Sequence, residues 1–512
     1  MNLLTDLWVP VLRRDGTQDK VALRQLTAAH PNPVVQVMFP DAMYDGIGTV
    51  LLIGIFQNAL RLTNPERRKL LDKPPTPEWV QGCLNPLAHH FSLMAPDGEV
   101  AFMQDISYPA SIHGRKWTEL PIQKLVVHHS IGDNTLKKGH DWFHNRNPDM
   151  GLCPTCAAVT LYAYQTLPGG GGAGYSGSPV EGALFTLNKG ETLWETILLN
   201  VLPPDLLETN KSTTPSPFTW SYEQGKKRDY IPTPLQQYWS QIRLIRFTEI
   251  ADGECSLCGA KGEVIRKMMN AGPSPKMGQE GNNPMDWLHP LCPITPRKKD
   301  GKRVKGFTPL KFCGLGYSEY PRVARIAPDK DDEAAAPVFE ATVGVDAFDG
   351  FPFTQWVFRG QFHQSQFMEW QEMILPVYSV SEEFREDFQI QVEAAVDFYK
   401  KLEYASFSRI KNLGFASNTG PTRVMFGAEF SRHLEAEFFR VISALRDIPD
   451  ADGIYKLHEK WAAVCRSAAY RLFDERSTLA DPMKRAKALR SLQKMINKAV
   501  QAYAPRQETE NE

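Results

Sequence analysis

Two widely separated CxxC pairs constrain the fold of this chain more than any other sequence feature. Cys153 and Cys156 form the first pair, and Cys255 and Cys258 form the second. Four thiolates are the ligand set of tetrahedral structural zinc. A compact zinc ribbon places its pairs about 15 to 20 residues apart, whereas residues 157–254 intervene here. The pattern predicts a structural zinc that joins two distant segments; two reduced pairs without metal, or a redox pair, are the alternatives.

Length and composition are those of a globular protein with more than one folding unit. The chain has 512 residues, of which 42% are hydrophobic and 23% charged. Domains usually span about 100 to 200 residues, so we expect roughly two to four units. The 58 basic residues are balanced by 59 acidic ones. Bulk charge therefore gives no support for non-specific nucleic-acid binding, and any such function must depend on local patches.

The N-terminus and the apolar runs indicate a cytoplasmic protein. Residues 1–6 show no basic leader followed by an apolar run, so we expect no signal peptide. The longest apolar candidate, Val50 to Phe56, is far shorter than the roughly 20 residues needed to cross a bilayer. We therefore expect a reducing compartment, in which disulfides are rare, and no membrane partner.

The first part of the chain begins with a predicted hairpin. Asp15-Gly16 forms its turn, and Pro10 favours an edge position for its first strand. Apolar residues at helical spacing then predict helices near 41–62 and 77–94.

Residues 105–375 are irregular, rich in proline and glycine, with strand-like runs at 322–326 and 338–343. Loops this long rarely persist in compact domains without a use. We therefore predict a mixed α+β body with functional loops over residues 1–376.

Apolar residues recur at helical spacing four times in the last third of the chain. The series cover residues 384–402, 426–445, 454–472 and 481–503. Asp481-Pro482 is a good cap and first-turn pair for the last one. Four amphipathic helices with short connections predict an antiparallel four-helix bundle over residues 377–512, with a short disordered tail from Gln507. The predicted fold class is thus α+β, a large zinc-containing body followed by a helical bundle.

A glycine-rich segment runs from Pro168 to Gly177. Gly169, Gly171 and Gly174 formally satisfy GxGxxG, but neither a preceding strand nor a following helix is evident, and no lysine with serine or threonine completes a phosphate loop. Bare backbone can approach a phosphate chain or a groove floor closely. The alternative is a flexible connector.

Two basic clusters are candidate phosphate contacts. One is residues 226–228, and the denser one contains Arg297, Lys298, Lys299, Lys302 and Arg303. Such a cluster gives salt-dependent affinity for nucleic acid, although a charge run is more often a solvated face. The histidines form no HExxH or comparable triad, and no nucleophile-elbow motif is present, so we expect no active site.

Several features taken in order resemble CasA, the large subunit of the type I-E CRISPR surveillance complex known as Cascade. Their shared order and spacing carry the resemblance. They are Asn2-Leu3-Leu4 with Asp6, Trp8 and Pro10-Val11; Phe102-Met103-Gln104; the Cys153 pair; the glycine segment from Pro168; Leu198 to Leu202; the Cys255 pair; and the closing helices.

The resemblance implies a function in nucleic-acid recognition. It implies a non-catalytic subunit that recognises the protospacer-adjacent motif in double-stranded DNA, promotes strand opening for the guide RNA, and helps recruit a separate helicase-nuclease. Protein would read the short motif and base pairing the rest, as in other RNA-guided systems. The closing helices would contact the small subunit and the DNA.

The resemblance also implies roles for individual residues. The motif-reading loop falls on Gly169, Gly170, Gly171 and Gly172, where bare backbone suits a narrow minor groove. A lysine finger falls on Lys276, with Lys267 as the alternative.

The strand-separating wedge falls on Gln364, whose neighbour His363 stands where a polar amide is expected. Residues 136–150 match the loop that docks on the 5′ handle of the guide RNA and on the neighbouring backbone subunit. Trp142, Phe143 and Asn145 are its candidates, with stacking as the chemistry.

Two other functions remain open from the residues alone. The cysteine and histidine content would suit a zinc-dependent or thiol hydrolase acting on nucleic acid. The near-zero net charge would suit a helical-bundle adaptor without DNA contact.

Overall fold

The computed structural model describes most of the chain. The described residues are 1–504 except 112–113, 115, 128–148, 169–176, 208–215, 222–232, 274–278, 281–282, 285–287, 300–301, 307–314, 327–333, 364–365, 416–420 and 448–449. Within the regular elements, only the backbone is described at 273, 279–280, 283–284, 295–299, 302–306, 363, 366 and 421–424.

Contacts divide the chain into two compact units. The first contains Met1–Pro309 and Ala336–Glu372, and the second contains Leu310–Ala335 and Met373–Glu512. The second unit therefore includes a segment from well before the expected boundary near residue 376. Both helix and sheet are present in the first unit, and the described elements of the second are helical apart from the end of a strand, Met373–Pro376. The mixed α+β class is confirmed.

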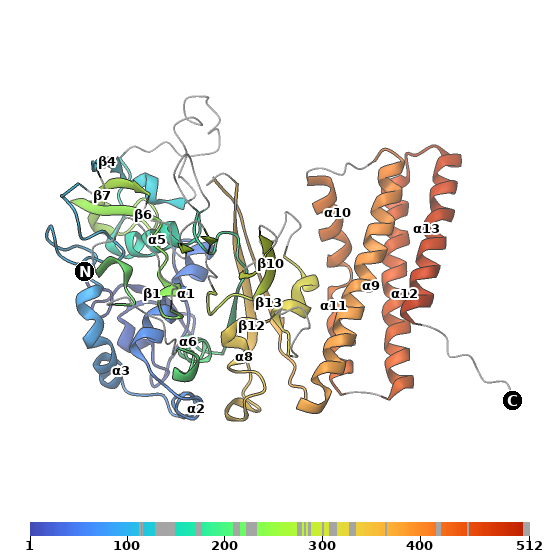
Figure 1. Cartoon of the computed structure of the whole chain (residues 1–512), viewed down its shortest axis with the longest axis horizontal. Coiled ribbons are helices and arrows are strands. Elements are labelled where there is room, and N and C mark those ends of the chain that lie inside the picture. Colours follow the sequence, from blue (N-terminus) through green and yellow to red (C-terminus); the bar gives the residue numbers. More distant parts are fainter. Residues whose placement is uncertain are drawn as a thin grey trace. The chain divides into compact units, whose positions relative to one another are not determined.

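Helices and strands alternate irregularly through the first unit (Figure 1). Its elements are β1 (Val9–Arg13), β2 (Gln18–Val21), β3 (Val34–Val37), α1 (Ala42–Ala59), α2 (Asn64–Asp72), α3 (Pro77–Leu84), β4 (Thr118–Pro121), α5 (Pro154–Thr166), β5 (Phe185–Lys189), α6 (Leu193–Leu199), β6 (Arg243–Glu254), β7 (Lys261–Pro273), β8 (Gln279–Glu280), β9 (Asn283–Pro284), β10 (Thr295–Lys299), β11 (Lys302–Gly306), α8 (Pro337–Glu340), β12 (Thr354–His363) and β13 (Gln366–Pro376, which continues into the second unit).

The predicted N-terminal hairpin is present, but its first strand is central. The sheet order is β2-β1-β3, so the edge position expected from Pro10 is wrong. Pairing with β3 starts at Val11, and the Pro10 carbonyl accepts a hydrogen bond from the Met38 amide at 2.8 Å. The missing N–H of proline removes only the reciprocal bond to Met38, at the point where the pairing with β3 begins.

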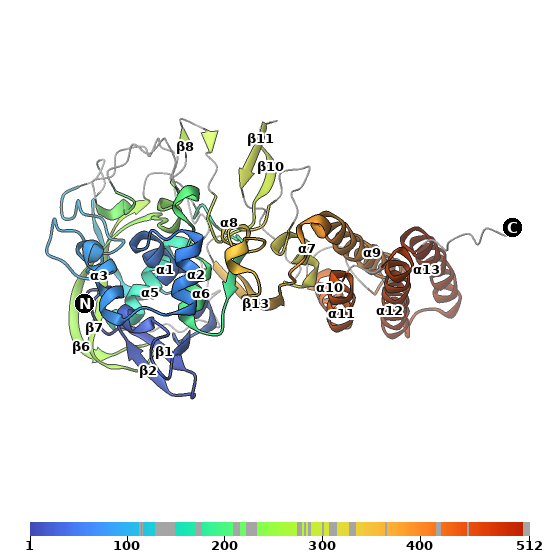
Figure 2. The ribbon, with the colours of Figure 1, turned by 90° about the horizontal axis from the view of Figure 1, so that it is seen from below.

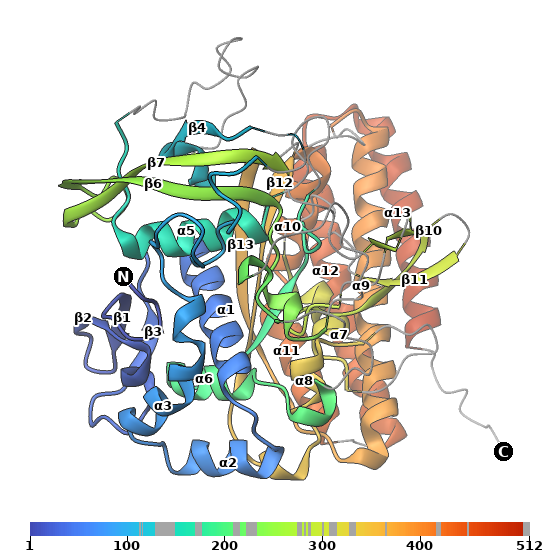
Figure 3. The same ribbon diagram turned by 60° about the vertical axis from the view of Figure 1, so that its left-hand side comes forward.

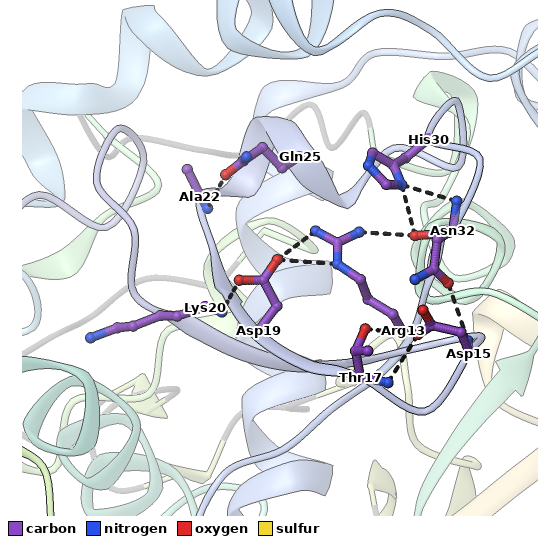
Figure 4. A network of polar contacts seen from close by, with 9 residues as sticks. All are labelled: Arg13, Asp15, Thr17, Asp19, Lys20, Ala22, Gln25, His30 and Asn32. Carbon is purple, nitrogen blue, oxygen red and sulfur yellow. Dashed lines mark hydrogen bonds and ion pairs between the residues drawn. The ribbon is translucent and has the colours of Figure 1, made fainter.

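A polar network fixes the hairpin turn (Figure 4). The Arg13 guanidinium donates to Asp19 Oδ2 at 2.7 Å and to the Asn32 carbonyl at 2.9 Å. Asp15 Oδ1 accepts from the Thr17 amide at 2.9 Å, which is the local bond that favours aspartate at a turn. The network ties the turn to the segment that leads into β3.

Helix α1 lies at the centre of the first unit. Asp41 caps it by accepting a hydrogen bond from the Met43 amide at 2.8 Å. Apolar residues occur on all its sides, and it is buried along nearly its whole length, as expected of a core helix. It contacts α3, α5 and α6, and so builds the core against which the sheets pack.

Two three-stranded sheets complete the first unit. One has the order β4-β7-β6, and its long β6–β7 hairpin runs beside α5 (Figure 3). The other has the order β13-β12-β5, in which β12 returns to pair with a strand from much earlier in the chain. These pairings bring distant segments together, as the two cysteine pairs predict.

The two strand-like runs after residue 320 begin in short helices and continue as turns or irregular chain, so their prediction as strands is wrong. The segment Tyr320–Val323 forms α7, and Pro337–Glu340 forms α8. A proline lies in the first turn of each, where its fixed φ and missing N–H favour helix initiation. This local start signal outweighs the β preference of the valines that follow.

The second unit is largely helical. Its longer helices are α9 (Arg385–Asn412), α10 (Pro421–Arg432), α11 (Glu435–Arg446), α12 (Ala451–Ser477) and α13 (Pro482–Tyr503). Helices α12 and α13 both pack against α9, as Figures 1 and 2 show. The second of the four predicted helices is divided, since the chain leaves helical geometry at His433 and Leu434.

Among the described residues, no single helix is long and apolar enough to cross a membrane. Helices α1 and α2 pass that test only together, across a bend of 118°.

Candidate metal centre and the loop bases beside it

The two CxxC pairs meet in space. The Sγ atoms of Cys153, Cys156, Cys255 and Cys258 all lie within 4.8 Å of one another. The Cys153 and Cys258 sulfurs are 3.7 Å apart. Zinc–sulfur bonds of about 2.3 Å would separate the sulfurs of a tetrahedral site by about 3.8 Å. The prediction that the pairs share one site is confirmed, and the sulfur spacing fits one zinc-sized ion.

The first pair is held by the start of α5. Cys153 is the N-cap residue, Pro154 occupies the first turn, and Cys156 follows within that turn. Proline at this position favours helix initiation, so the chain turns into the helix between the two ligands. Cys156 is 1% exposed and Cys153 is 8% exposed. Both thiols therefore face the interior from one helix end.

The second pair lies in the turn between β6 and β7. The Cys255 amide donates to the Ala260 carbonyl at 2.8 Å, and the Gly259 amide donates to the Cys255 carbonyl at 2.8 Å. Gly259 has φ +72°, which favours glycine over any other residue. The turn is thus fixed by backbone bonds, with Cys255 buried and Cys258 exposed.

Backbone bonds outside the sulfur cluster hold the two segments in register. The amides of Leu152 and Ile265 each donate to the other's carbonyl, at 3.0 and 2.8 Å. The Ser256 amide donates to the Gly151 carbonyl at 2.8 Å. A Cβ on Gly151 would lie 2.8 Å from Val264 Cγ2. Only glycine therefore allows this close approach of the segment before α5 to β7.

The electrostatics of the cluster favour a bound cation. Hydrogen bonds with Cys153 and Cys156 lower the pKa of the Cys255 thiol. Hydrogen bonds with Cys153 and Cys255, together with burial, raise the pKa of the Cys156 thiol. A second thiolate is thus unfavourable unless a positive charge joins it, and a thiophilic divalent ion supplies that charge. Four sulfur donors leave no open position, so the arrangement suits a structural ion.

The other end of α5 is held by a glutamine that the sequence analysis missed. Gln165 is fully buried. Its Oε1 accepts from the amides of Ile242 and Arg243 at 2.8 and 2.9 Å, and its Nε2 donates to the Arg243 carbonyl at 2.9 Å. A glutamine within an otherwise mostly apolar helix is the only sequence signal for it. Helix α5 is therefore tied to the β6–β7 hairpin at both ends.

The bases of the predicted DNA-facing segments lie near this glutamine. The Ser178 amide donates to the Pro168 carbonyl at 2.9 Å and so closes the base of the glycine segment. Arg243 pairs with Pro273, after which the segment with Lys276 begins. A Cβ on Gly360 in β12 would lie 3.8 Å from Leu167 Cδ1, so the strand leading to the predicted wedge passes beside the end of α5.

Most of the predicted nucleic-acid-facing residues lie outside the described residues. This holds for Gly169 to Gly172, Lys276, Gln364, Trp142, Phe143 and Asn145. Only the backbone of His363 is described, at the end of β12. The alternative finger Lys267 forms ion pairs with Glu119 at 3.1 Å and Glu249 at 3.2 Å.

The denser basic cluster lies on a two-stranded hairpin. Strands β10 and β11 pair so that Lys298 faces Arg303 and Lys299 faces Lys302 along the backbone register, while Arg297 faces Val304. Only the backbone of these residues is described.

Comparisons with known proteins give one consistent result. The family model for CRISPR-associated protein Cse1 matches residues 2–472. The fold is similar to that of Cse1 from Acidimicrobium ferrooxidans, with TM-score 0.70, 16% identity and 99% of each chain covered. It is also similar to CasA (Cse1) from Thermus thermophilus, with TM-score 0.66, 17% identity, and 98% of this chain and 99% of that chain covered.

A third similar chain belongs to a structure described as a CRISPR RNA-guided surveillance complex. Its TM-score is 0.69 at 15% identity, with 97% of this chain and 99% of that chain covered. At these identities the structures establish the fold. The family match spans nearly the whole chain and establishes membership: the chain belongs to the CRISPR-associated Cse1 family, also named CasA.

Proposed function

We propose that this chain is the non-catalytic large subunit of a type I-E CRISPR RNA-guided surveillance complex. It recognises the protospacer-adjacent motif in double-stranded DNA, promotes strand opening and helps recruit the helicase-nuclease. The observation that carries the proposal is the family match over residues 2–472, together with the shared fold of a chain from a surveillance complex. Its partners are target DNA, guide RNA, the backbone and small subunits and the nuclease, in the cytoplasm.

Motif recognition is assigned to the glycine segment and Lys276. Gly169 to Gly172 approach the minor groove with bare backbone, and Lys276 adds a positive charge beside them. The arrangement of the loop bases supports this assignment, because the buried side-chain amide of Gln165 lies close to the base of the glycine segment and to the base of the Lys276 segment. His363 and Gln364 form the wedge, whose polar side chains replace hydrogen bonds that separated bases lose.

Guide-RNA docking is assigned to the segment before the metal centre. Trp142, Phe143 and Asn145 contact the 5′ handle, with stacking as the main chemistry. The support is that this segment leads into Gly151 and Leu152, which are hydrogen-bonded to the β6–β7 hairpin. A structural zinc held by the four cysteines supplies a rigid base for it.

The basic hairpin contacts phosphates through Arg297, Lys298, Lys299, Lys302 and Arg303. The cation-to-cation register described above supports a polyanionic partner.

In the second unit, we interpret α10 and α11 as one helix of the bundle that is interrupted. The helices then form an antiparallel four-helix bundle that faces the small subunit.

Target binding by the reconstituted complex tests the proposal. The combined variant Gly172→Asp and Gln364→Ala is expected to lower affinity for duplex DNA carrying the motif by about 10- to 100-fold, because a carboxylate repels phosphate and the wedge loses its amide. Unchanged motif-dependent binding would falsify the proposal. Gly82→Asp is the matched control, since Gly82 lies in α3 with open space around its Cβ position.

Two further measurements separate the alternatives. A helical adaptor without DNA contact predicts that affinity is independent of salt, whereas phosphate contacts predict a negative slope of log K against log salt. A hydrolase predicts metal-dependent turnover of nucleic acid by the isolated chain, and the proposed subunit shows none.

A further inference from the structure

Gln165 occupies a position where three buried backbone groups need partners. The β6–β7 ladder is irregular between Arg243 and Ile245, where the register shifts. The extra residue of this irregularity lies on β7, and β6 is the edge strand of the β4-β7-β6 sheet, so main-chain groups on its outer side have no strand partner. The amides of Ile242 and Arg243, and the Arg243 carbonyl, bond to the Gln165 side chain instead. One amide thus takes the place of a neighbouring strand at the end of the hairpin.

The same amide lies at the base of two segments assigned to motif recognition. Pro168 follows Gln165 by less than one helical turn and accepts the bond that closes the glycine segment. Arg243, which Gln165 holds, pairs with Pro273, and the segment containing Lys276 starts just beyond it. A shift between α5 and the start of β6 would therefore move both bases relative to each other.

Gln165 holds one end of α5 by directional hydrogen bonds, and the cysteine cluster holds the other end. The cysteine cluster fixes the helix start, about 20 Å away for a helix of this length. Helix α5 is buried along most of its length and packs against α1, which holds its axis. Gln165 adds directional bonds to the start of β6 at the end where the segments emerge.

We propose that Gln165 is a positioning residue that sets the spacing between Pro168 and Pro273, the described bases of the glycine segment and the Lys276 segment, and thereby the discrimination between correct and incorrect adjacent motifs. The inference rests on the proposed function above. Gln165 contacts no DNA in this mechanism. It acts through the backbone of Ile242 and Arg243.

The chain contains a matched control for this residue. Gln57 in α1 is also fully buried, and its side-chain amide bonds to the backbone of a distant residue. It donates to the Leu202 carbonyl at 3.2 Å and accepts from the Leu202 amide at 2.6 Å. Methionine has a similar shape to glutamine but cannot make its hydrogen bonds. Gln165→Met and Gln57→Met therefore remove the same kind of side-chain to backbone hydrogen bonding at two places.

The test compares both variants in the reconstituted complex. Gln165→Met is expected to lower the ratio of affinities for correct and altered motifs by about tenfold, a loss comparable to one mismatched base pair. The complex with Gln165→Met should bind a target that is already unpaired with wild-type affinity, because base pairing between guide RNA and target is intact. Gln57→Met is expected to leave both quantities unchanged. Equal loss of the ratio in both variants, or no loss in Gln165→Met, overturns the inference.

A second variant covers impaired folding of the first. Burial favours the neutral carboxyl of Gln165→Glu, which keeps both acceptor bonds and can donate through its hydroxyl to the Arg243 carbonyl, so its ratio should lie between wild type and Gln165→Met. If neither Gln165 variant assembles, while Gln57→Met does, the residue serves folding and the inference is overturned. If Gly172→Asp with Gln364→Ala has no effect, the proposed function itself fails; if that variant is impaired and Gln165→Met is not, only this inference fails.

Discussion

Both units have an apolar core rich in aromatic rings, but they differ in how far apart in the sequence their polar contacts reach. In the first unit, buried polar side chains connect segments far apart in the sequence. In the second unit, aromatic and aliphatic side chains pack between helices, and most polar contacts are local. Directional hydrogen bonds fix distances more tightly than apolar packing does, so the first unit is the better platform for loops that must be placed accurately.

Arg67 in α2 illustrates the first unit. Its side chain is fully buried, yet it donates hydrogen bonds to the carbonyls of Leu198, Leu199 and Ala341 at 3.2, 3.3 and 3.1 Å. Those partners lie 131 or more positions along the chain. One guanidinium thereby joins three segments that no continuous element connects.

Tyr317 illustrates the second unit. Its ring stacks on Phe438 with centroids 4.5 Å apart and lies 4.9 Å from the ring of Tyr399. Trp461 packs on the same Phe438 at 5.8 Å and donates through Nε1 to the Ala395 carbonyl at 3.0 Å. This aromatic cluster explains why residues 310–335 belong with the closing helices.

Removing one buried cysteine should give the largest difference in stability between the two units. Cys156→Ser is expected to abolish zinc binding and to lower the free energy of unfolding of the first unit by several kcal/mol, about 4 or more, because structural metal binding is folding energy. Elemental analysis, denaturant unfolding and hydrogen exchange of the full chain measure this. Exchange in α9 and α12 should stay that of the wild type.

Cys465→Ser is the corresponding control, since Cys465 is buried in α12. It should affect exchange only in the second unit and leave zinc content unchanged. Full zinc content in Cys156→Ser would contradict the metal assignment, and equal loss of protection in both units would contradict their independence.

Trp461→Leu should have the next largest effect, in the opposite unit. Loss of the ring contacts with Phe438 and of the bond to the Ala395 carbonyl is expected to cost about 3 kcal/mol. Hydrogen exchange should rise in α9, α11 and α12, while zinc content and motif discrimination in the reconstituted complex stay normal. A change in zinc content would show that the second unit supports the metal centre.

His289 should give a smaller, pH-dependent effect confined to the first unit. Its ring is fully buried beside Phe185 and Tyr238, and Nδ1 accepts from the Leu291 amide at 3.2 Å. Burial lowers the pKa of His289 to about 3 from its usual 6.5. The unfolded chain therefore binds a proton that the folded chain excludes, and stability falls as pH drops below 6.5 towards 3.

Between pH 7 and 5 the contribution of His289 is on the order of 2 kcal/mol. His289→Gln should flatten this part of the pH profile of unfolding, measured with denaturant at each pH. His433→Gln removes an exposed histidine from the second unit and should leave the profile as in the wild type. Identical slopes in all three proteins would show that His289 is not the group responsible.

The sequence predicts the four-cysteine cluster because two CxxC pairs are a strong signal, even though their separation along the chain is unusual. The closing helices follow from apolar periodicity, although their interruption at His433 and Leu434 has no such signal. Short segments are predicted less well: prolines at 321 and 337 start helices where valines favour strands. Gln165 could not be identified, because its role depends on lying beside the open edge of β6, a placement that only the folded chain creates.

The distance between the two cysteine pairs along the chain also affects how the protein is made. Cys153 and Cys258 are 105 positions apart, which at about 5 to 20 residues per second is on the order of ten seconds of translation. During that interval the first pair leaves the ribosome without its partners. Until the β6–β7 turn has been synthesised, Cys153 and Cys156 lack the other two cysteines of the cluster, so we expect this interval to be the most oxidation-sensitive stage of synthesis.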